Sequence, residues 1–377
     1  MKKIALLGST GSIGVQTLNV IRRNPDKFKI VSLSAGANGD LLKKQVAEFT
    51  PAVATLSSPV AWTEEFKSTE FFFGEDAFTN AVIQEADIVV VALVGFKGII
   101  AVLKAIEMGK DIALANKESL VVGGDLVMRL AKQKGVKIFP IDSEHSAVWQ
   151  ALSQDYSKPF NKIILTASGG AFRDFTKEQL QTVTARDALK HPNWDMGAKI
   201  TIDCASMVNK AFEVIEAKWL YNTSFDKIDV IVHRESIIHS MVEFDDGSVI
   251  AQMSYPSMEL PIALALNPDT RLKSNVKSLD FASLKNLTFV NLDRDKYPCF
   301  DLVVQAGKAG GCMPAVANGA NEMAVKLFLQ DKISFNDIYK AISHALSSYN
   351  KKCCGTFECY KNADTYARNC VKELFKV

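Results

Sequence analysis

One stretch near the start decides the fold of this chain: Lys3-Ile4-Ala5-Leu6-Leu7-Gly8-Ser9-Thr10-Gly11-Ser12-Ile13-Gly14. An apolar run here meets a turn with three glycines, and the amphipathic stretch 12–23 follows, so the turn lies between a predicted strand and a predicted helix. Glycine allows the backbone to approach a pyrophosphate bound at the helix N-terminus. The spacing is GxxGxxG, a variant of the dinucleotide fingerprint, and a strand-to-helix turn without a ligand is the alternative.

The rest of the chain predicts an α/β protein with a Rossmann-like parallel sheet at its N-terminus, an α+β middle and a helical C-terminus. The expected strands are 29–34, 87–93, 112–115, 162–167, 230–232, 240–244 and 249–253, and the expected helices are 99–108, 206–220, 315–330, 334–348 and 362–375. We therefore predict a nucleotide-binding domain (1–142), a catalytic domain with metal, substrate, flap and dimer strands (143–285), a linker (286–310) and a helical domain (311–377).

The end of the second predicted strand bears on the choice of cofactor. Folds that bind NAD usually place an acid there to hold the ribose hydroxyls. Here the strand runs into Ser34-Ala35-Gly36-Ala37-Asn38, which contains no acid and leaves room for a 2′-phosphate. NADPH is therefore favoured over NADH, with Ser34, Asn38 and backbone donors in place of an arginine.

Carboxylates stand at a predicted strand end. Asp142 and Glu144 follow the apolar run 136–141 and are two apart, so on extended backbone they point the same way. Glu213 follows 69 residues after Glu144. Hard cations such as Mg²⁺ prefer two or three such oxygen ligands. The alternatives are a helix cap for Asp142, a first-turn position for Glu144 and a helix surface for Glu213.

Donor groups suited to a phosphate accompany these acids. Asn209 and Lys210 share a helical face with Glu213, and Ser168 precedes Gly169-Gly170, whose backbone can form an anion nest. Lys117 follows the fourth predicted strand, where α/β folds bind ligands. His191 could also donate to phosphate, while Trp194 and Met196 in the same turn-rich stretch predict a closing loop. A solvated Lys117 and a structural His191 are the alternatives.

Bulk composition narrows the class of protein. The 377 residues are 48% hydrophobic and 23% charged, as in soluble globular proteins. The net charge of +2 argues against nucleic-acid binding, and no apolar run suits a signal peptide or a membrane span. The 7 cysteines predict reduced cytoplasmic thiols. Cys353, Cys354 and Cys359 cluster, but they lack a CxxC pair and a nearby histidine, so thiols are favoured over a zinc site.

Seven motifs together resemble the 1-deoxy-D-xylulose 5-phosphate reductoisomerase family in order and near spacing. They are GSTGSIG (8–14), LANKESLV (114–121), IDSEHSA (141–147), TASGGAF (166–172), HPNWDMG (191–197), SMVNKAFEVIEA (206–217) and HRESIIHSMVEFDDGSV (233–249). The resemblance runs over essentially the whole chain. It implies NADPH-dependent rearrangement and reduction of the sugar phosphate to 2-C-methyl-D-erythritol 4-phosphate, on the route to isoprenoids, by a cytoplasmic homodimer.

The resemblance also assigns roles to single residues. Asp142, Glu144 and Glu213 are similar to the ligands of Mg²⁺ or Mn²⁺. Lys117, Glu144 and His191 resemble the family's catalytic residues. The residues that resemble its substrate contacts are Lys117, Ser143, Glu144, Ser168, His191, Trp194, Cys204, Asn209, Lys210 and Glu213. The residues that resemble its cofactor contacts are Gly8, Thr10, Gly11, Ser12, Ile13, Gly36, Asn38, Asn116, Glu118 and Gly197. The carbon shift is compatible with a retro-aldol and aldol route or with an α-ketol shift.

Two positions depart from the family pattern. Cys204 stands where the family usually has a phosphate-binding serine, and a thiol is the weaker donor, so Ser206 or water could replace that contact. Ala37 stands where some members carry a basic residue near the 2′-phosphate, which predicts a looser preference for NADPH. A metal-independent NAD(P) dehydrogenase acting on another sugar phosphate and a nucleotide-sensing scaffold protein are the rival hypotheses.

Overall fold

The computed structural model describes residues 1–190, 192–194 and 196–377. Its chain forms two compact units that interleave along the sequence. The first comprises Met1–Asn116, Val127–Ser146 and Ser257–Lys277, and the second comprises Lys117–Leu126, Ala147–Pro256 and Ser278–Val377. The functional division that we predict from the sequence remains a prediction, because it divides the chain by role and not by contact.

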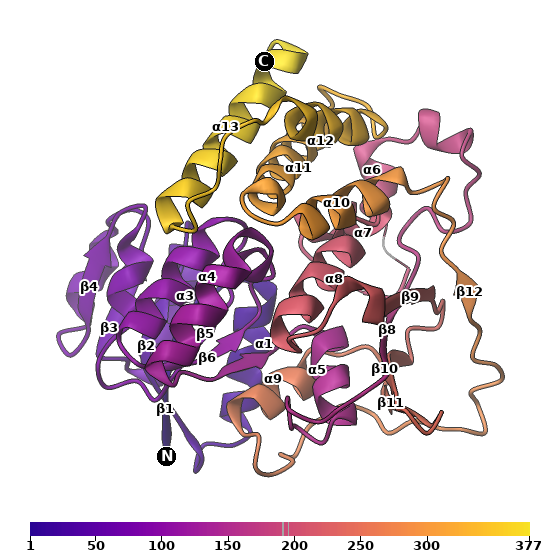
Figure 1. Cartoon of the computed structure of the whole chain (residues 1–377). Helices are drawn as coiled ribbons and strands as arrows, with labels where there is room; N and C mark the ends of the chain where they lie inside the picture. The colour runs from indigo at the N-terminus through magenta and orange to yellow at the C-terminus, as the bar shows by residue number, and fades with distance from the viewer. Residues whose placement is uncertain (191, 195) are drawn as a thin grey trace. The chain divides into compact units, whose positions relative to one another are not determined.

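The first unit is built on a seven-stranded parallel sheet (Figure 1). Its strands are β1 (Lys2–Leu7), β2 (Phe28–Ser34), β3 (Val53–Leu56), β4 (Glu70–Phe73), β5 (Ile88–Val91), β6 (Asp111–Leu114) and β7 (Ile138–Pro140), in the order β4-β3-β2-β1-β5-β6-β7. The order reverses between β1 and β5, and ligands of open α/β sheets bind at such a reversal, beyond the carboxyl ends of the strands. The predicted Rossmann-like sheet is confirmed.

The helices of this unit connect the strands, as a parallel sheet requires. They are α1 (Ser12–Arg22), α2 (Gly39–Phe49), α3 (Lys97–Glu107), the two 3₁₀ turns η1 (Ala61–Glu65) and η2 (Ala77–Ala81), and parts of α4 (Glu118–Lys134) and α5 (Ser143–Ala151). Strands β3 and β4 are absent from the sequence-based prediction. Each is only four residues long and falls where no longer apolar run marks a strand.

Helix α9 (Glu259–Leu266) also belongs to the first unit, whereas the sequence-based boundaries place it in the middle domain. It contacts α1, β6 and β7, and Pro261 to Leu266 are all buried. Its last carbonyl accepts a hydrogen bond from Lys2 Nζ at 2.9 Å, and Glu259 pairs with Arg23 at 2.5 Å. An apolar surface all round a short helix is typical of burial, which explains why α9 packs back onto the first sheet.

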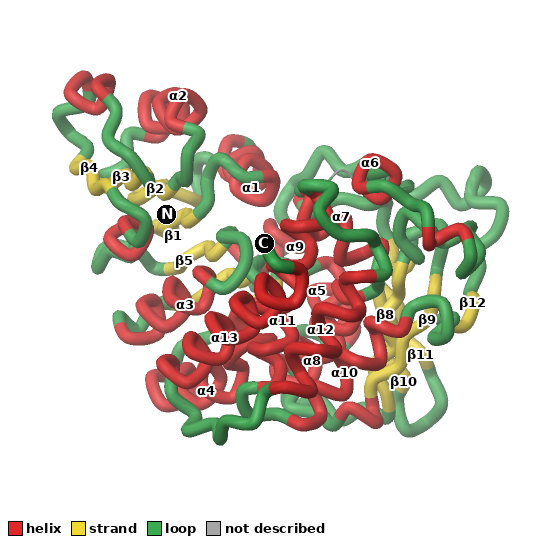
Figure 2. Tube along the Cα trace, turned by 90° about the horizontal axis from the view of Figure 1, so that it is seen from above, coloured by secondary structure: helices red, strands yellow, loops and turns green. Residues whose placement is uncertain are grey.

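The second unit contains a mixed five-stranded sheet, with helices α8 and α10 on one side of it (Figure 2). Its strands are β8 (Lys162–Ala167), β9 (Ile228–Val232), β10 (Ile238–Glu243), β11 (Val249–Met253) and β12 (Val290–Asn291), in the order β11-β10-β8-β9-β12. β8 and β9 are parallel, and β10 and β11 form the predicted hairpin, whose turn contains Gly247 with φ of 82°. The predicted α+β character of the middle of the chain is confirmed.

The helices of the second unit correct several predicted boundaries. They are α6 (Ala185–Ala188), α7 (Ala198–Ala205), α8 (Val208–Leu220), α10 (Pro298–Ala309), α11 (Met313–Leu329), α12 (Asp337–Ser348) and α13 (Phe357–Phe375), with 3₁₀ turns η3 (Gln179–Gln181) and η4 (Phe225–Lys227). The helix predicted over 206–220 starts at Val208, because Met207 takes a left-handed φ of 63° that separates α7 from α8. The range 286–310, predicted as a linker, holds β12 and α10.

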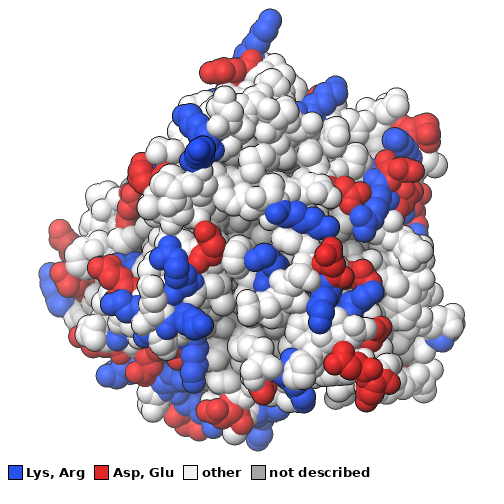
Figure 3. Space-filling view, viewed as in Figure 1, with Lys and Arg blue, Asp and Glu red and all other residues white. Residues whose placement is uncertain are grey.

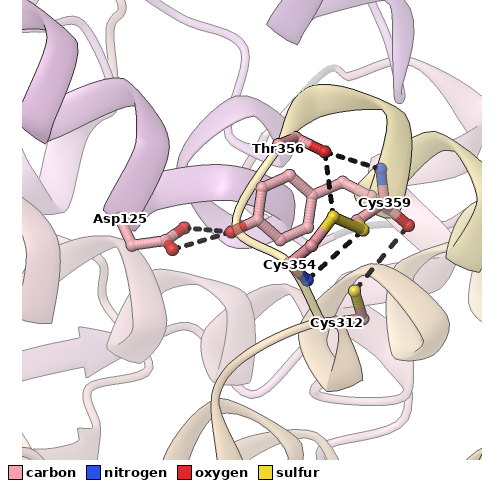
Figure 4. The surroundings of a disulfide bond; sticks show 6 residues. Asp125, Cys312, Cys354, Thr356 and Cys359 are labelled. Carbon is pink, nitrogen blue, oxygen red and sulfur yellow. Dashed lines mark hydrogen bonds between the residues drawn. A yellow bond between two sulfur atoms is a disulfide. The ribbon is translucent and has the colours of Figure 1, made fainter. Parts of the chain in front are cut away.

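A disulfide between Cys354 and Cys359 closes a short loop at the start of α13 (Figure 4). The prediction of thiols at these two positions is therefore wrong, because the turn before α13 brings the two sulfurs together. Around the bond, Thr356 Oγ1 accepts from Cys359 N at 3.4 Å, and Cys312 Sγ donates to the Cys359 carbonyl at 3.7 Å. The next residue, Tyr360, donates its hydroxyl to Asp125 of α4 at 2.7 Å.

Among the residues that the structure describes, no helix combines the length and the apolar character that crossing a bilayer requires.

Candidate active site

The glycine turn of the first unit is shaped by backbone crowding. A Cβ on Gly14 would lie 2.2 Å from the Gly8 carbonyl oxygen, and a Cβ on Gly8, whose φ is 88°, would lie 2.5 Å from the Ala92 oxygen. Helix α1 begins after Gly11 with no side-chain cap and no acid in its first turn. Its first N–H groups and its dipole therefore suit an anion, and the turn fits the pyrophosphate of a dinucleotide. Among the predicted cofactor residues, Thr10, Ser12 and Ile13 lie in or directly after this turn.

The end of β2 leads into a cavity of about 700 Å³ within the first unit, lined in part by Ala37, Asn38 and Trp62. Asn38 caps α2 there, because its Oδ1 accepts from Leu41 N at 3.1 Å. Gly36 has open space where a Cβ would stand. The cavity begins where the strand that should carry the ribose-binding acid ends, the place expected for the 2′-phosphate end of NADPH, and the carboxylates of Asp40 and Glu65 also line it.

The carboxyl end of β6 is tied to that of β5 by Asn116. Its Nδ2 donates to the carbonyls of Leu93 and Gly95, each at 3.0 Å. Gly98 at the start of α3 leaves space for this amide, since a Cβ there would lie 2.0 Å from it. Asn116 therefore holds together the loops beside the glycine turn, a role in addition to the predicted cofactor contact.

Asp142 and Glu144 follow β7, at the same edge of the sheet as the glycine turn. Ser143 Oγ donates to Glu144 Oε2 at 2.5 Å, and Asp142 lies 3.4 Å from Nδ1 of the buried His145. Helix α5 starts at Ser143, so Asp142 and Glu144 straddle a helix start and do not lie along an extended strand as predicted. Both carboxylates are half-buried, and such oxygens suit a hard cation.

In the second unit, Glu213 of α8 lies among donor groups. Asn209 donates to it at 2.5 Å, Lys210 donates to its other oxygen, and Lys117 Nζ lies 3.5 Å away. The carboxylate is only 1% exposed, so its charge needs these partners. The predicted helical face is confirmed as a geometric arrangement. A buried carboxylate held by these three donors suits a ligand position in the predicted cation site.

Glu216, one turn along α8, is missing from the sequence-based set. Its carboxylate lies 3.6 Å from Lys117 Nζ and is 1% exposed. Its spacing of three residues from Glu213 places it on the same helical face, a signal that the sequence already contains. Lys117 thus lies close to two buried carboxylates, which hold its ammonium in place.

The residues predicted to bind phosphate meet around the end of β8. Lys210 Nζ donates to the Thr166 carbonyl at 2.6 Å, two residues before Ser168. Gly170 has φ of 70° and passes so close to Cys204 that a Cβ would lie 2.5 Å from the Cys204 carbonyl oxygen. The glycine backbone, the Lys210 ammonium and the half-buried Cys204 therefore come together within the second unit.

Trp194 and His239 form a contact that the sequence does not suggest. Their ring centroids are 6.0 Å apart, and His239 Nε2 lies 2.9 Å from Ser254 Oγ. His239 is buried in β10, one residue before the strand predicted over 240–244, and the sequence predicts no role for it. Its ring lies beside Trp194 of the predicted closing loop. His191, predicted to lie near the substrate, falls outside the described residues.

The two remaining predicted cofactor residues lie at the starts of α4 and α7. Gly197 is the N-cap of α7, and Glu118 is the first residue of α4. Burial opposes ionisation of Glu118, but the Lys199 ammonium at 2.7 Å outweighs it and lowers the pKa of that carboxyl. Glu118 is therefore an anion held firmly in place.

Surface charge agrees with the balanced composition. Figure 3 shows Lys and Arg side chains interspersed with Asp and Glu side chains on the face in view. A nucleic-acid-binding face would instead gather one sign of charge.

Comparison with known proteins identifies relatives along the whole chain. Family models for 1-deoxy-D-xylulose 5-phosphate reductoisomerase match residues 4–124, its C-terminal domain matches 138–221, and a DXP reductoisomerase C-terminal domain matches 253–370. A 1-deoxy-D-xylulose 5-phosphate reductoisomerase from a Geobacillus species is 46% identical and covers 99% of this chain and 100% of its own. The Synechocystis protein of the same name is also 46% identical, covering 99% and 98%.

Solved structures agree with these relatives. A DOX-P reductoisomerase in complex with NADPH, fosmidomycin and magnesium is 37% identical, has a TM-score of 0.96, and covers 100% of this chain and 98% of its own. The Zymomonas mobilis reductoisomerase in complex with NADPH is 37% identical with a TM-score of 0.92, covering 100% and 99%. With such identity over nearly the full length of both chains, this chain belongs to the 1-deoxy-D-xylulose 5-phosphate reductoisomerase family.

Proposed function

We propose that this chain catalyses the NADPH- and divalent-metal-dependent conversion of 1-deoxy-D-xylulose 5-phosphate to 2-C-methyl-D-erythritol 4-phosphate. One observation supports it above the others. The glycine turn after β1 and the carboxylates Asp142 and Glu144 after β7 lie at the same edge of one sheet. A hydride donor and a cation bound at that edge are the two reagents that rearrangement followed by reduction needs.

We assign the cation to Asp142, Glu144 and Glu213, as the family resemblance implies. These three carboxylates give the all-oxygen donor set that Mg²⁺ or Mn²⁺ prefers. When bound, the cation supplies Lewis-acid polarisation of the substrate oxygens, and NADPH supplies the hydride. A metal-independent dehydrogenase is the less favoured reading, because it leaves these carboxylates without a function.

The chain's own side chains orient the sugar phosphate. We assign the phosphate to Ser168, Cys204, Asn209 and Lys210, and the sugar oxygens to Lys117 and Ser143. Lys117 is held by Glu213 and Glu216, so its ammonium can donate to a substrate oxygen without first being ordered. We assign Trp194 and Met196 to the loop that excludes water and His191 to the substrate, and the phosphate contacts provide binding energy for closure of the loop. Glu144 can also move a proton at the substrate oxygens.

The cofactor contacts are proposed along the edge of the first sheet and at two helix starts. They are Gly8, Thr10, Gly11, Ser12, Ile13, Gly36, Asn38, Asn116, Glu118 and Gly197. The N-terminus of α1 stabilises the pyrophosphate, and the acid-free end of β2 accepts the 2′-phosphate.

The loss of NADPH absorbance with 1-deoxy-D-xylulose 5-phosphate tests the activity. We expect oxidation with Mg²⁺ or Mn²⁺ and a loss of nearly all turnover with excess chelator, while NADPH binding persists. Restoring the metal should restore the rate. Equal turnover with chelator present would contradict the metal assignment, and folded, metal-loaded protein that leaves NADPH unoxidised would contradict the proposed activity.

We also propose a homodimer that forms through the β11 edge of the second sheet. β11 is paired only with β10 in the sheet order, and Val249 and Ile250 on it are 49% and 47% exposed. An edge strand with exposed apolar side chains is a template for pairing with another copy. As a metabolic enzyme that depends on NADPH, the protein is assigned to the cytoplasm.

Sedimentation of the purified protein tests the dimer. We expect twice the chain mass of 41.4 kDa, and a shift towards the monomer in Ile250→Asp, because a carboxylate is costly to bury in an interface. Phe73→Asp is the matched control, since Phe73 is an exposed apolar residue on β4, an edge strand of the other sheet. A monomeric wild type, or equal dissociation in both variants, would contradict the β11 interface.

A further inference from the structure

A buried chain of charges in the second unit connects a proposed cofactor contact to the helical core. Lys199 Nζ of α7 lies 2.7 Å from Glu118 Oε1 of α4 and 2.8 Å from Asp203 Oδ2. The side chains of Glu118 and Asp203 are 9% and 2% exposed. One ammonium therefore pairs with two buried carboxylates that come from different helices.

Helix α11 contributes a hydrogen bond to the Asp203 carboxylate of this group. Asn321, which is fully buried, donates its Nδ2 to Asp203 Oδ1 at 2.8 Å. Burial alone would lower the pKa of Lys199, but the carboxylates of Asp203 and Glu118 outweigh it and raise that pKa above its ordinary value. Lys199 thus carries a permanent charge, and Asn321 and Asp203 fix where that charge lies.

The positions of these residues along the chain indicate what the group does. Lys199 is the second residue of α7, two residues after Gly197 and five after Trp194, so it lies at the end of the predicted closing loop. Glu118 directly follows Asn116 and Lys117. The ion pair joins positions 81 apart, so it fastens the end of the loop to the segment that follows β6.

We propose that Lys199 is a positioning residue. Held by Asp203 and Asn321, it fixes the Glu118 carboxylate and anchors the end of the Trp194 loop to the cofactor-binding segment. The inference rests on the proposed function, because that function makes Glu118 a contact of NADPH. A surface ion pair would contribute little, but loss of the cation here removes the ammonium from two buried carboxylates at once.

A double-mutant cycle on NADPH affinity tests the proposal. We expect Lys199→Met to weaken NADPH binding about tenfold or more, the scale of one charge-assisted hydrogen bond, with Lys199→Arg close to wild type. Because Lys199 acts through Glu118, the variant with both Lys199→Met and Glu118→Gln should bind no more weakly than Glu118→Gln alone. NADPH fluorescence on binding measures each dissociation constant without any turnover.

Arg368→Met is the matched control. Arg368 pairs with Glu322 at 2.5 Å and with Asp364 at 2.6 Å, so its loss also leaves partly buried carboxylates without a cation. We expect it to lower the melting temperature and leave the NADPH dissociation constant unchanged. Equal effects of Lys199→Met and Arg368→Met on binding, or additive effects in the cycle, would overturn the positioning role.

The readout also separates this inference from the proposed function. If wild-type protein binds NADPH but does not oxidise it, the proposed activity is contradicted, and the double-mutant cycle on NADPH affinity can still be measured. If Lys199→Met keeps normal turnover and an unchanged NADPH dissociation constant, the positioning role of Lys199 is contradicted and the proposed activity is not. If Lys199→Met does not fold, Lys199→Arg combined with Asp203→Asn carries the test, and unchanged NADPH affinity in that variant overturns the proposal.

Discussion

Glu144→Gln should lower kcat by about 100- to 1000-fold, with NADPH affinity and melting temperature close to those of wild type. The change keeps the size of the side chain and its capacity to accept from Ser143 Oγ. It removes one negative charge from the proposed cation site and the only group there that we assign to proton movement. Steady-state kinetics at several metal concentrations measure the effect, and added metal should recover only part of the loss.

The control for this variant is Glu107→Gln on α3. Glu107 is 68% exposed and pairs with Lys104 at 3.0 Å, so its charge should have no measurable effect on kcat. Wild-type turnover by Glu144→Gln at saturating metal would remove Glu144 from the proposed ligand set. A similar loss in both variants would point to a general effect of net charge.

Gly14→Ala should have the second-largest effect, this time on stability and cofactor binding together. The added methyl would lie 2.2 Å from the Gly8 carbonyl oxygen and 2.6 Å from the Ser9 Cα, and these are backbone atoms that have little room to move. We expect about 3 kcal/mol of destabilisation, at the upper end for overpacking, from urea unfolding. NADPH affinity should fall at least tenfold, since α1 must shift away from the turn.

Gly39→Ala on α2 is the matched control. A methyl at Gly39 would meet Val60 Cγ1 at 3.6 Å, an ordinary contact, and alanine favours a helix over glycine. That variant should be as stable as wild type or slightly more so. Equal unfolding midpoints for Gly14→Ala and wild type would show that the turn tolerates the methyl and that crowding does not shape it.

Local patterns in the sequence predict the parts of the fold that short-range rules control. The glycine turn predicts β1 and α1, because the crowding between Gly8 and Gly14 acts between residues only six apart in the chain. The spacing of Asn209, Lys210 and Glu213 predicts that they share one face of α8, because a helix repeats every 3.6 residues. The acids after β7 are found for the same reason, since a strand end is marked by the apolar run before it.

Other features depend on contacts distant in the chain and are therefore missed. Helix α7 contains Ile200, Thr201 and Ile202, whose branched side chains disfavour a helix, and burial of Thr201 and Ile202 overrides that preference. The contact of Trp194 with His239 joins residues 45 apart, so no local pattern reveals it. Lys199 beside Glu118 is missed likewise, because the partner of a charge lies outside any window of sequence.

The bond between Cys354 and Cys359 has a consequence for how this enzyme is handled. Closing a ring of this length restricts the unfolded chain and stabilises the folded protein by about 2 kcal/mol, and a reducing agent that opens the bond removes that contribution. Protein purified in air and protein kept with a reducing agent would then differ in their resistance to heat. Storage with or without a reducing agent thus selects between two forms of one enzyme.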